Sequence, residues 1–432
     1  MRILLLTTYF RPDVAANGVI MARLAEEFLA NGHKVTILTS VPHYDINQVW
    51  PEYSRKLVYA ERTSSMSIYR LYTYVARDKA NVLQRLMAYG SFNLLSLATG
   101  AALPKHDVML VPSPPLTNGV IADLIARIRG TPFIYNVQDI WPDVAVRAGM
   151  IRSSRAILQL RNMEDYVYRR AAAVTVLSEG FRSNLLAKGV PDEKISVIPN
   201  FVDAEFMQPS AKSNPFSIRY GLAEKFVVLY AGNMGFSQGL ENVLDAAKCL
   251  EAFSDIKFLF VGNGAGRPTA EAYWRFLGLH NVDFLPFQPH EDLPDMYGAA
   301  DVCLIPLRRG FTNESVPSKL LTIMAAGKPA IASVDEGSET WALMHRAKCG
   351  LSVEPENPDA LAAAILRYHG DPDLCTAAGT NARRCVTTEF EPRAAARKYL
   401  DVMQMAIDGK RHRPEPERIA AYADTTTCRP DK

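Results

Sequence analysis

A polar loop that leads into a short apolar helix carries residues suited to binding an anionic ligand. The segment spans Asn313 to Pro329, and Lys319 lies in its predicted first helical turn. Pro317 favours a helix start, and Gly327 favours a helix end. In this arrangement the free amides of the first turn and the Lys319 ammonium face one point, where a diphosphate would meet positive charge. The segment therefore predicts a phosphate-binding site.

Two glycine clusters also follow predicted strands. Gly232-Asn233-Met234-Gly235 comes after a strand that ends at Ala231, and Gly239 precedes the next predicted helix. Glycines there would let backbone amides and a helix N-terminus approach a phosphate closely. The second cluster, Gly262-Asn263-Gly264-Ala265-Gly266, lacks the full G-x-G-x-x-G spacing of a dinucleotide site. A tight strand-to-helix turn without a ligand explains it as well as a binding loop does.

These loops require strands and helices that alternate along the chain. Short runs rich in Val, Ile and Leu alternate with helix-length segments, as in parallel sheets covered by helices on both faces. The predicted strands are 3–8, 35–39, 108–111, 133–137, 173–177, 195–198, 226–231, 256–261, 282–285, 302–305 and 329–332, and the predicted helices include 18–30 and 116–129. We expect an α/β fold of two Rossmann-like, doubly wound domains that face a central cleft.

A stretch rich in Ser, Pro and Asn, 208–215, marks a linker between these domains. We therefore expect an N-terminal domain at 1–205 and a C-terminal domain at 206–390. A helix at 391–407 is expected to cross back to the N-terminal domain, and the polar tail at 408–432 is expected to be disordered.

The composition is that of a globular enzyme. The 432 residues carry a formal net charge of only +2, so no basic surface field points to nucleic acid. The six scattered cysteines form no C-x-x-C pair and indicate reduced thiols rather than a zinc or disulfide framework. The opening run, 1–8, is expected to be a buried strand and not a signal peptide, and 86–103 is too polar for a membrane span.

Several motifs along residues 1–405 occur in an order that is far more specific than any one of them. They are Gly18, Asp139-Ile140-Trp141-Pro142, Val197-Ile198-Pro199-Asn200, Tyr230-Ala231-Gly232-Asn233-Met234-Gly235, Gln238-Gly239-Leu240-Glu241, Val261-Gly262-Asn263-Gly264, Ala300-Asp301 and Glu314 with Pro317-Ser318-Lys319. In this combination the chain resembles the retaining glycosyltransferases of family 4, in particular their bacterial exopolysaccharide and O-antigen branch. The resemblance implies a GT-B fold with an acceptor-binding N-terminal domain and a nucleotide-sugar-binding C-terminal domain.

The resemblance also implies a set of site residues. Glu314, Asp139 and Lys319 are the expected catalytic residues, with Glu314 on the sugar hydroxyls. The residues expected to bind the donor are Gly18, Gly232, Asn233, Gly235, Gln238, Gly262, Asn263, Gly264, Phe287, Pro317, Ser318, Lys319, Leu320 and Thr322. Gln138 and Asp139 are expected to contact the acceptor or the sugar. A solvated carboxylate at Glu314, a surface charge at Lys319 and a helix cap at Asp139 are the structural alternatives.

The chain departs from the family pattern within this site. Thr322 stands where a second Glu would contact the ribose, so that contact would be a weaker hydroxyl hydrogen bond or absent. Asn233 and Gln238 occupy the places of an Arg and a Lys that neutralise the diphosphate in many relatives. Lys319 is therefore the expected main phosphate cation, with Arg308 or Arg309 as the expected helper.

The implied reaction moves a hexosyl or N-acetylaminohexosyl unit from a nucleotide-sugar, with UDP expected, to a glycan or polyprenyl-diphosphate-linked acceptor in surface polysaccharide biosynthesis. The departing diphosphate oxygen can take the proton, so positioning, domain closure and leaving-group stabilisation would carry catalysis. No metal or other cofactor is expected, because Asp371-Pro372-Asp373 fits a turn and the histidines lack ligand spacing. We expect a cytoplasmic protein that contacts the inner membrane peripherally through 79–104, with a core helix as the alternative.

Three other functions stay open. A nucleotide-sugar epimerase can use the same scaffold, and a nucleotide-sugar-binding protein without turnover would tolerate Thr322, Asn233 and Gln238. A nicotinamide-dependent oxidoreductase is disfavoured, because the glycine fingerprint is incomplete and no strand-end acid for ribose follows the first strand.

Overall fold

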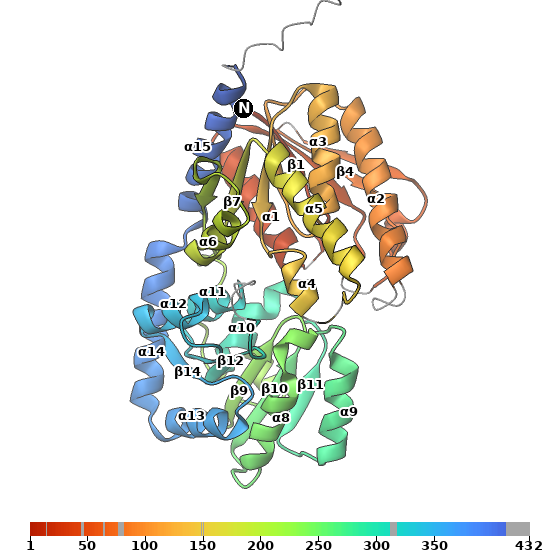
Figure 1. Ribbon diagram of the computed structural model, residues 1–432. Helices are drawn as coiled ribbons and strands as arrows, with labels where there is room; N and C mark the ends of the chain where they lie inside the picture. The colour runs from red at the N-terminus through yellow and green to blue at the C-terminus, as the bar shows by residue number, and fades with distance from the viewer. Residues whose placement is uncertain are drawn as a thin grey trace, which may run out of the picture.

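The computed structural model consists of two α/β domains, one above the other in Figure 1. It describes residues 1–411 except 14, 45, 46, 64, 77–81, 148, 150 and 312–317. The strands of the N-terminal domain are β1 (Arg2–Leu6), β2 (Lys34–Ser40), β3 (Val58–Arg62), β4 (Met66–Leu71), β5 (Val108–Pro112), β6 (Phe133–Val137), β7 (Ala173–Val176) and β8 (Ile195–Val197). Its helices are α1 (Ala16–Ala30), α2 (Val82–Ala102), α3 (Thr117–Arg129), α4 (Asp143–Arg147), α5 (Ser154–Arg170) and α6 (Glu179–Ala187), with 3-10 turns at Pro51–Tyr53 and Asp192–Lys194.

The N-terminal sheet has the order β3-β4-β2-β1-β5-β6-β7-β8. Neighbouring strands are parallel except β3, which pairs with β4 in the antiparallel direction and places Glu61 opposite Ile68. β5 and β6 are buried along their whole length because helices cover both faces of the sheet. β3 and β4 are absent from the predicted strands, because exposed and partly buried residues alternate along β3 and give no continuous apolar run.

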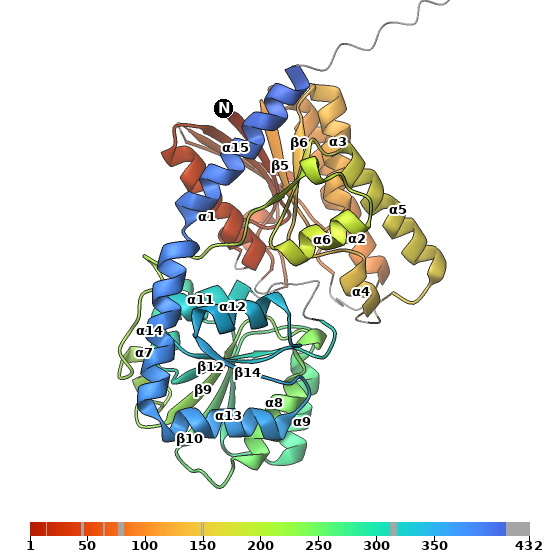
Figure 2. The ribbon, with the colours of Figure 1, turned by 60° about the vertical axis from the view of Figure 1, so that its left-hand side comes forward.

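Helices pack on both faces of this sheet. α1 covers one face together with α15 (Pro392–Arg411), as Figure 2 shows. Their buried side chains, such as Phe28 and Met403, share one apolar cluster with Ile3 and Leu5 of β1. α2, α3 and α5 cover the opposite face and bury Phe92 among others.

The C-terminal domain has a second, six-stranded sheet with the order β11-β10-β9-β12-β13-β14, all parallel. Its strands are β9 (Phe226–Ala231), β10 (Ile256–Val261), β11 (Val282–Leu285), β12 (Val302–Pro306), β13 (Ala330–Ser333) and β14 (Gly350–Val353). Its helices are α7 (Pro215–Arg219), α8 (Leu240–Cys249), α9 (Arg267–Leu277), α10 (Leu293–Gly298), α11 (Ser318–Ala325), α12 (Glu339–Ala347), α13 (Pro358–Gly370) and α14 (Pro372–Glu389), with 3-10 turns at Phe236–Gln238 and His290–Asp292.

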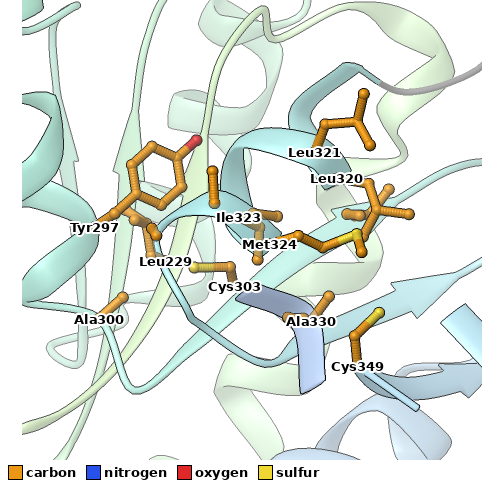
Figure 3. Packing of buried hydrophobic residues seen from close by; sticks show 14 of the residues in the cluster. Leu229, Tyr297, Ala300, Cys303, Leu320, Leu321, Ile323, Met324, Ala330 and Cys349 are labelled. Carbon is orange, nitrogen blue, oxygen red and sulfur yellow. The ribbon is translucent and has the colours of Figure 1, made fainter. Parts of the chain in front are cut away.

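Each face of the second sheet also has its own apolar core. α8, α9 and α13 pack on one face. α10, α11, α12 and α14 pack on the other, where Leu320, Ile323 and Met324 of α11 belong to the apolar cluster that includes Cys303 of β12 (Figure 3). Two Rossmann-like domains are thereby confirmed, and β14 is the strand of this sheet that the sequence does not predict.

Two segments connect the domains. The linker leaves β8 and reaches α7, and the chain returns after α14 through α15, which packs against α1, β5 and β6 (Figure 2). The helix continues to Arg411, so the expected helix end at 407 is too early. Residues 412–432 of the expected disordered tail lie outside the described residues.

Candidate functional site

Both sheets change their winding direction at a central strand. β1 lies between β2 and β5, and β9 lies between β10 and β12. Such a switch point opens a crevice at the carboxyl ends of the strands, where ligands bind in this class of fold. In the C-terminal domain the loops after β9 and β12 flank that crevice. The first of them is the loop 232–239, and the second leads into α11.

The carboxyl ends of the two sheets face each other across the domain boundary. The backbone N–H of Gly180, at the start of α6, donates to Oε1 of Glu339, at the start of α12, over 2.9 Å. α6 follows β7 and α12 follows β13, so this hydrogen bond joins loops from both sheets (Figure 1). The candidate site therefore lies between the domains.

Lys319 lies at the centre of the candidate donor site. It belongs to the first turn of α11, and its Nζ donates to Oε1 of Gln238 over 2.7 Å. The same Nζ lies 4.2 Å from the centre of the Tyr230 ring, a cation–π contact. Among the described residues no carboxylate lies within 4.0 Å of Nζ. Burial lowers the pKa of Lys319 to about 7, because removal from water disfavours the charged ammonium.

The first glycine loop is held in shape by buried contacts. Met234 is fully buried, and Tyr230 donates from its hydroxyl to the carbonyl oxygen of Asn233 over 2.7 Å. Gly232 has φ of 131°, a conformation that favours glycine. A Cβ atom on Gly232 would lie 3.9 Å from Nζ of Lys319. The structure thus brings the predicted loop and the predicted lysine together.

The second glycine cluster packs against the first. A Cβ atom on Gly262 would lie 2.0 Å from the carbonyl oxygen of Gly232, and one on Gly264 would lie 2.6 Å from that of Met234. Two backbone hydrogen bonds of 2.8 Å join Met234 to Asn263 and Gly266. This close approach of two backbones explains the glycines without a ligand, and a donor contact there stays a prediction.

The two arginines considered as helper cations already have partners. Arg308 donates to the carbonyl oxygen of Phe236 and to Glu241, each over less than 3 Å, so it braces the first glycine loop. Arg309 pairs with Glu354 over 2.7 Å. Lys319 therefore remains the best-placed cation for a diphosphate among these three.

The other expected donor residues fall into different environments. Glu314 and Pro317 lie outside the described residues. Ser318 is the first residue of α11, and half-buried Phe287 lies just beyond β11. Leu320 is 2% exposed and points into the core (Figure 3), which leaves only its backbone for a donor.

In the N-terminal domain, Gly18 and Gln138 are tightly packed. A Cβ atom on Gly18 would lie 3.1 Å from Cβ of Tyr9, so this glycine lets α1 approach the loop after β1. Gln138 is 9% exposed and its amide is bonded at both ends to protein groups, which favours a supporting role over direct substrate contact. Asp139 is half-buried in the loop between β6 and α4. Its contact with a substrate stays a prediction.

A partly buried ion cluster anchors the helix that follows the loop carrying Asp139. Lys188 lies 2.8 Å from Asp143, the first residue of α4, and 2.7 Å from Glu164 of α5. Burial raises the pKa of Glu164, and Lys188 opposes that rise. The cluster fixes α4 to the body of the domain.

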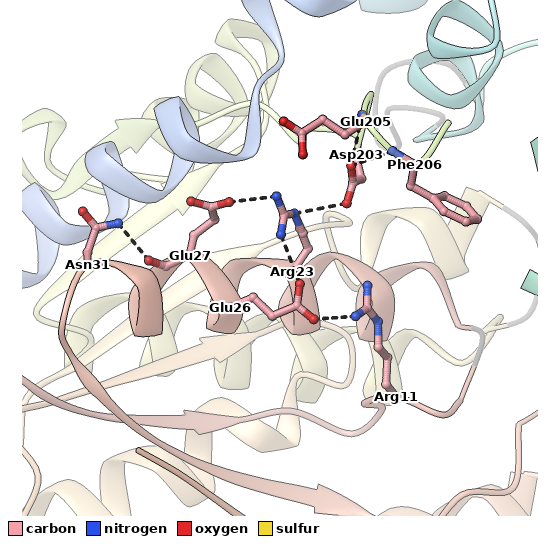
Figure 4. Close-up of polar contacts among 8 residues, drawn as sticks. All are labelled: Arg11, Arg23, Glu26, Glu27, Asn31, Asp203, Glu205 and Phe206. Carbon is pink, nitrogen blue, oxygen red and sulfur yellow. Dashed lines mark hydrogen bonds and ion pairs between the residues drawn. The ribbon is translucent and has the colours of Figure 1, made fainter. Parts of the chain in front are cut away.

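A cavity of about 990 Å³ lies between the domains beside the linker. Its walls come from α1, from the linker around Asp203 and from His290 and Thr322 of the C-terminal domain. Figure 4 shows Arg23 of α1 between Asp203, at 3.3 Å, and Glu27, at 3.0 Å. Thr322, the expected ribose contact, therefore faces a space that both domains enclose.

Tyr230 is the site residue that sequence reasoning missed. It lies inside a predicted strand, where a tyrosine ordinarily belongs to the core, and only the fold reveals Lys319 over its ring.

Within the described part of the chain, no three His, Cys, Asp or Glu side chains form a group that could hold a metal ion. Asp371 instead caps α14 by accepting from Leu374 N over 2.9 Å. None of the described helices has both the length and the apolarity of a membrane span.

Comparison with known proteins covers both halves of the chain. Residues 17–200 match the model of the glycosyl transferase 4-like domain, and residues 218–385 match that of the glycosyl transferases group 1. A putative colanic acid biosynthesis glycosyl transferase of Escherichia coli, WcaI, is 28% identical over 84% of this chain and 91% of its own length.

Solved structures share the whole architecture. Sucrose-phosphate synthase from Thermosynechococcus elongatus superposes with a TM-score of 0.73 at 20% identity, over 95% of this chain and all of the other. Anabaena HepE in complex with UDP-glucose gives a TM-score of 0.70 at 17% identity, over 94% of this chain and 99% of the other. Both matches concern the GT-B fold. The two matched domain models show that this chain is a glycosyltransferase of family 4, and the solved structures show that it has the GT-B fold.

Proposed function

We propose that this glycosyltransferase takes its sugar from a nucleotide-sugar, bound through UDP, and transfers it with retention of configuration. The observation that carries the proposal is the position of Lys319, whose ammonium lies against the first glycine loop and bonds to Gln238. Because Gly232 has no side chain, a diphosphate can approach this ammonium from the side of the loop.

The charge distribution fits a diphosphate. Lys319 lies in the first turn of α11, and a Cβ atom on Gly232 of the glycine loop would lie 3.9 Å from its Nζ. The N-terminus of a helix adds partial positive charge to such a site. The leaving diphosphate gains negative charge as its bond to the sugar breaks, so a fixed cation stabilises the transition state more than the ground state. Gln238 then holds the ammonium in place as a neutral partner.

The proposed reaction needs no strong protein base. In retaining transfer the acceptor hydroxyl attacks from the side on which the nucleotide leaves, and the departing diphosphate oxygen takes its proton. Asp139 would orient the acceptor from the N-terminal domain, and Glu314 would hold the sugar hydroxyls. Closure of the two domains would bring these groups together and exclude water.

The proposed acceptor is a glycan or a polyprenyl-diphosphate-linked sugar of a surface polysaccharide, and the transferred unit is a hexosyl or N-acetylaminohexosyl group. The named role of WcaI in colanic acid biosynthesis supports this assignment. The structure of HepE with UDP-glucose supports UDP as the nucleotide. Action at the cytoplasmic face of the inner membrane follows from such an acceptor.

Peripheral membrane contact through residues 79–104 is part of this proposal. Leu83, Leu86 and Leu94 of α2 are 66%, 61% and 70% exposed, and they lie on one side of the helix. Sedimentation with anionic lipid vesicles tests the contact. The double variant Leu86→Gln with Leu94→Gln is expected to stay in the supernatant. Leu158→Gln, at a 60% exposed leucine of α5, is expected to pellet as the unchanged protein does. Equal pelleting of all three would contradict the contact.

Product analysis over time tests the reaction itself. Transfer yields free UDP and a new glycoside in equal amounts, and NMR of its anomeric carbon reports retention. An epimerase would change the donor sugar without an acceptor, and a binding protein would do neither. Lys319→Ala is expected to lose transfer while staying folded, and unimpaired transfer by both Lys319→Ala and Glu314→Ala would refute the site.

A further inference from the structure

A chain of buried hydrogen bonds runs through the N-terminal domain to the residue before Asp139. Tyr399 of α15 accepts at its hydroxyl from Nδ2 of Asn136 over 2.9 Å. Asn136 accepts at Oδ1 from Nε2 of Gln138 over 2.7 Å. Gln138 accepts at Oε1 from Nδ2 of Asn200 over 2.9 Å. Four side chains thus form one continuous path.

Every side chain in this path is removed from water. Tyr399 is 2% exposed, Asn136 is fully buried, and Gln138 and Asn200 are 9% and 8% exposed. The second N–H of the Asn136 amide donates to Thr175 over 3.0 Å, so both of its donors are satisfied. A polar group at this depth is costly unless each partner stays in place, so the path has one favoured geometry.

The two ends of the path belong to the two segments that cross between the domains. Tyr399 lies in α15, which returns from the C-terminal domain, and Asn200 lies at the start of the linker. A few residues further on, the linker is bound to the other domain, because Arg383 of α14 donates to the carbonyl oxygens of Ala204 and Met207 over 2.8 and 2.7 Å. Between residues 200 and 204 the linker therefore passes from contacts with the N-terminal domain to contacts with the C-terminal domain.

The crossing segments also contact each other at this point. The backbone N–H of Val202 donates to the carbonyl oxygen of Phe390, just before α15, over 3.3 Å. The two crossing segments therefore meet within a few residues of Asn200, which holds Gln138. The side chain of Gln138 is thus bonded directly to one crossing segment, at Asn200, and through Asn136 to the other, at Tyr399.

We propose that Tyr399 and Asn200 are positioning residues that act through Gln138 to set the loop bearing Asp139, an inference that rests on the proposed transfer reaction. The path links the arrangement of the domains to the acceptor side of the site. Gln138 is fixed at its backbone too, where its N–H donates to Oγ of Ser113 over 3.3 Å. Motion at either end of the path reaches Asp139 through the adjoining peptide.

Hydrogen exchange tests the coupling without reference to activity. Tyr399→Phe removes the hydroxyl that accepts from Asn136 and keeps the ring. Amides 138–147 are expected to exchange about tenfold faster in this variant, because Asn136 loses its bond to Tyr399 and holds Gln138 less firmly. Tyr368→Phe, at a buried tyrosine of the C-terminal domain, is the control and is expected to leave these amides unchanged. Unchanged exchange at 138–147 in Tyr399→Phe would overturn the inference.

Steady-state kinetics test the positioning role. Tyr399→Phe and Asn200→Ala are each expected to lower kcat for transfer about tenfold, with the donor dissociation constant unchanged. Because both act through Gln138, the double variant is expected to lose little more than either single variant. Losses of kcat that add up in the double variant would contradict the proposal. So would folded single variants whose kcat equals that of the unchanged protein. Absence of transfer by the unchanged protein would refute the proposed function and leave the exchange experiment as a separate test.

Discussion

The affinity for the nucleotide-sugar is expected to fall as the pH rises through the pKa of Lys319. Burial lowers this pKa to about 7. Below pH 7 the free protein already carries the charge that a diphosphate needs. Above pH 7 the lysine is mostly neutral, and binding must take up a proton. If the bound diphosphate restores an ordinary lysine pKa of about 10.4, the dissociation constant rises about tenfold between pH 6 and pH 8, or ~1.4 kcal/mol.

Isothermal titration calorimetry with a nucleotide-sugar measures both quantities. The diphosphate of such a donor is esterified at both ends, so it does not titrate in this range. Heats measured in two buffers of different ionisation enthalpy give the number of protons taken up, which is expected to approach one at pH 8. Lys319→Arg stays charged at every pH in the range and is expected to bind with a flat pH profile. Equal affinity and no proton uptake at pH 6 and pH 8 in the unchanged protein would refute the reasoning.

Two further predictions concern the framework of the site. Gly262→Ala is expected to destabilise the protein by about 3 kcal/mol in urea unfolding, because its Cβ would lie 2.0 Å from the carbonyl oxygen of Gly232. Gly221→Ala, where φ is also positive but no atom lies within 4 Å, is expected to cost about 1 kcal/mol, and equal losses would contradict the packing argument. Lys188→Ala is expected to leave Glu164 buried without its cation and to raise the pKa of that carboxyl further. The folded state of the variant then binds more protons than the unfolded state above about pH 4.3, so its stability falls as the pH rises toward the new pKa. Its deficit in urea midpoint relative to the parent should be larger at pH 8 than at pH 5, and a constant deficit would contradict this assignment.

The sequence predicts most of the parallel strands because each is a continuous apolar run between turn residues. It misses β3, whose alternating pattern follows from its place at a sheet edge with one solvated side. It also misses β14, a short strand of partly buried residues that starts at Gly350. β3 and β14 are edge strands, where burial is incomplete and the apolar signal is weak. β4, which is also missed, lies inside the sheet, but its positions Met66, Ser67 and Tyr69 are only partly buried and Arg70 interrupts its apolar run.

The candidate site is predictable to a smaller extent. The glycine loop and Lys319 stand out in the sequence because their residue types suit phosphate and both follow strands. The burial of Leu320 and Gln138 is a tertiary property that local pattern does not encode. The bond between Asn136 and Tyr399 joins residues 263 positions apart, which only the returning helix brings together.

The central claim is that the cleft of the C-terminal domain binds a nucleoside diphosphate at Lys319. Thermal unfolding of the protein with UDP, GDP, ADP, TDP, CMP or NAD, beside Lys319→Ala, tests it most directly, since a ligand of the native state raises the melting temperature. We predict an increase with UDP that is lost in the variant. An increase with NAD alone, or none with any nucleotide, would contradict the claim.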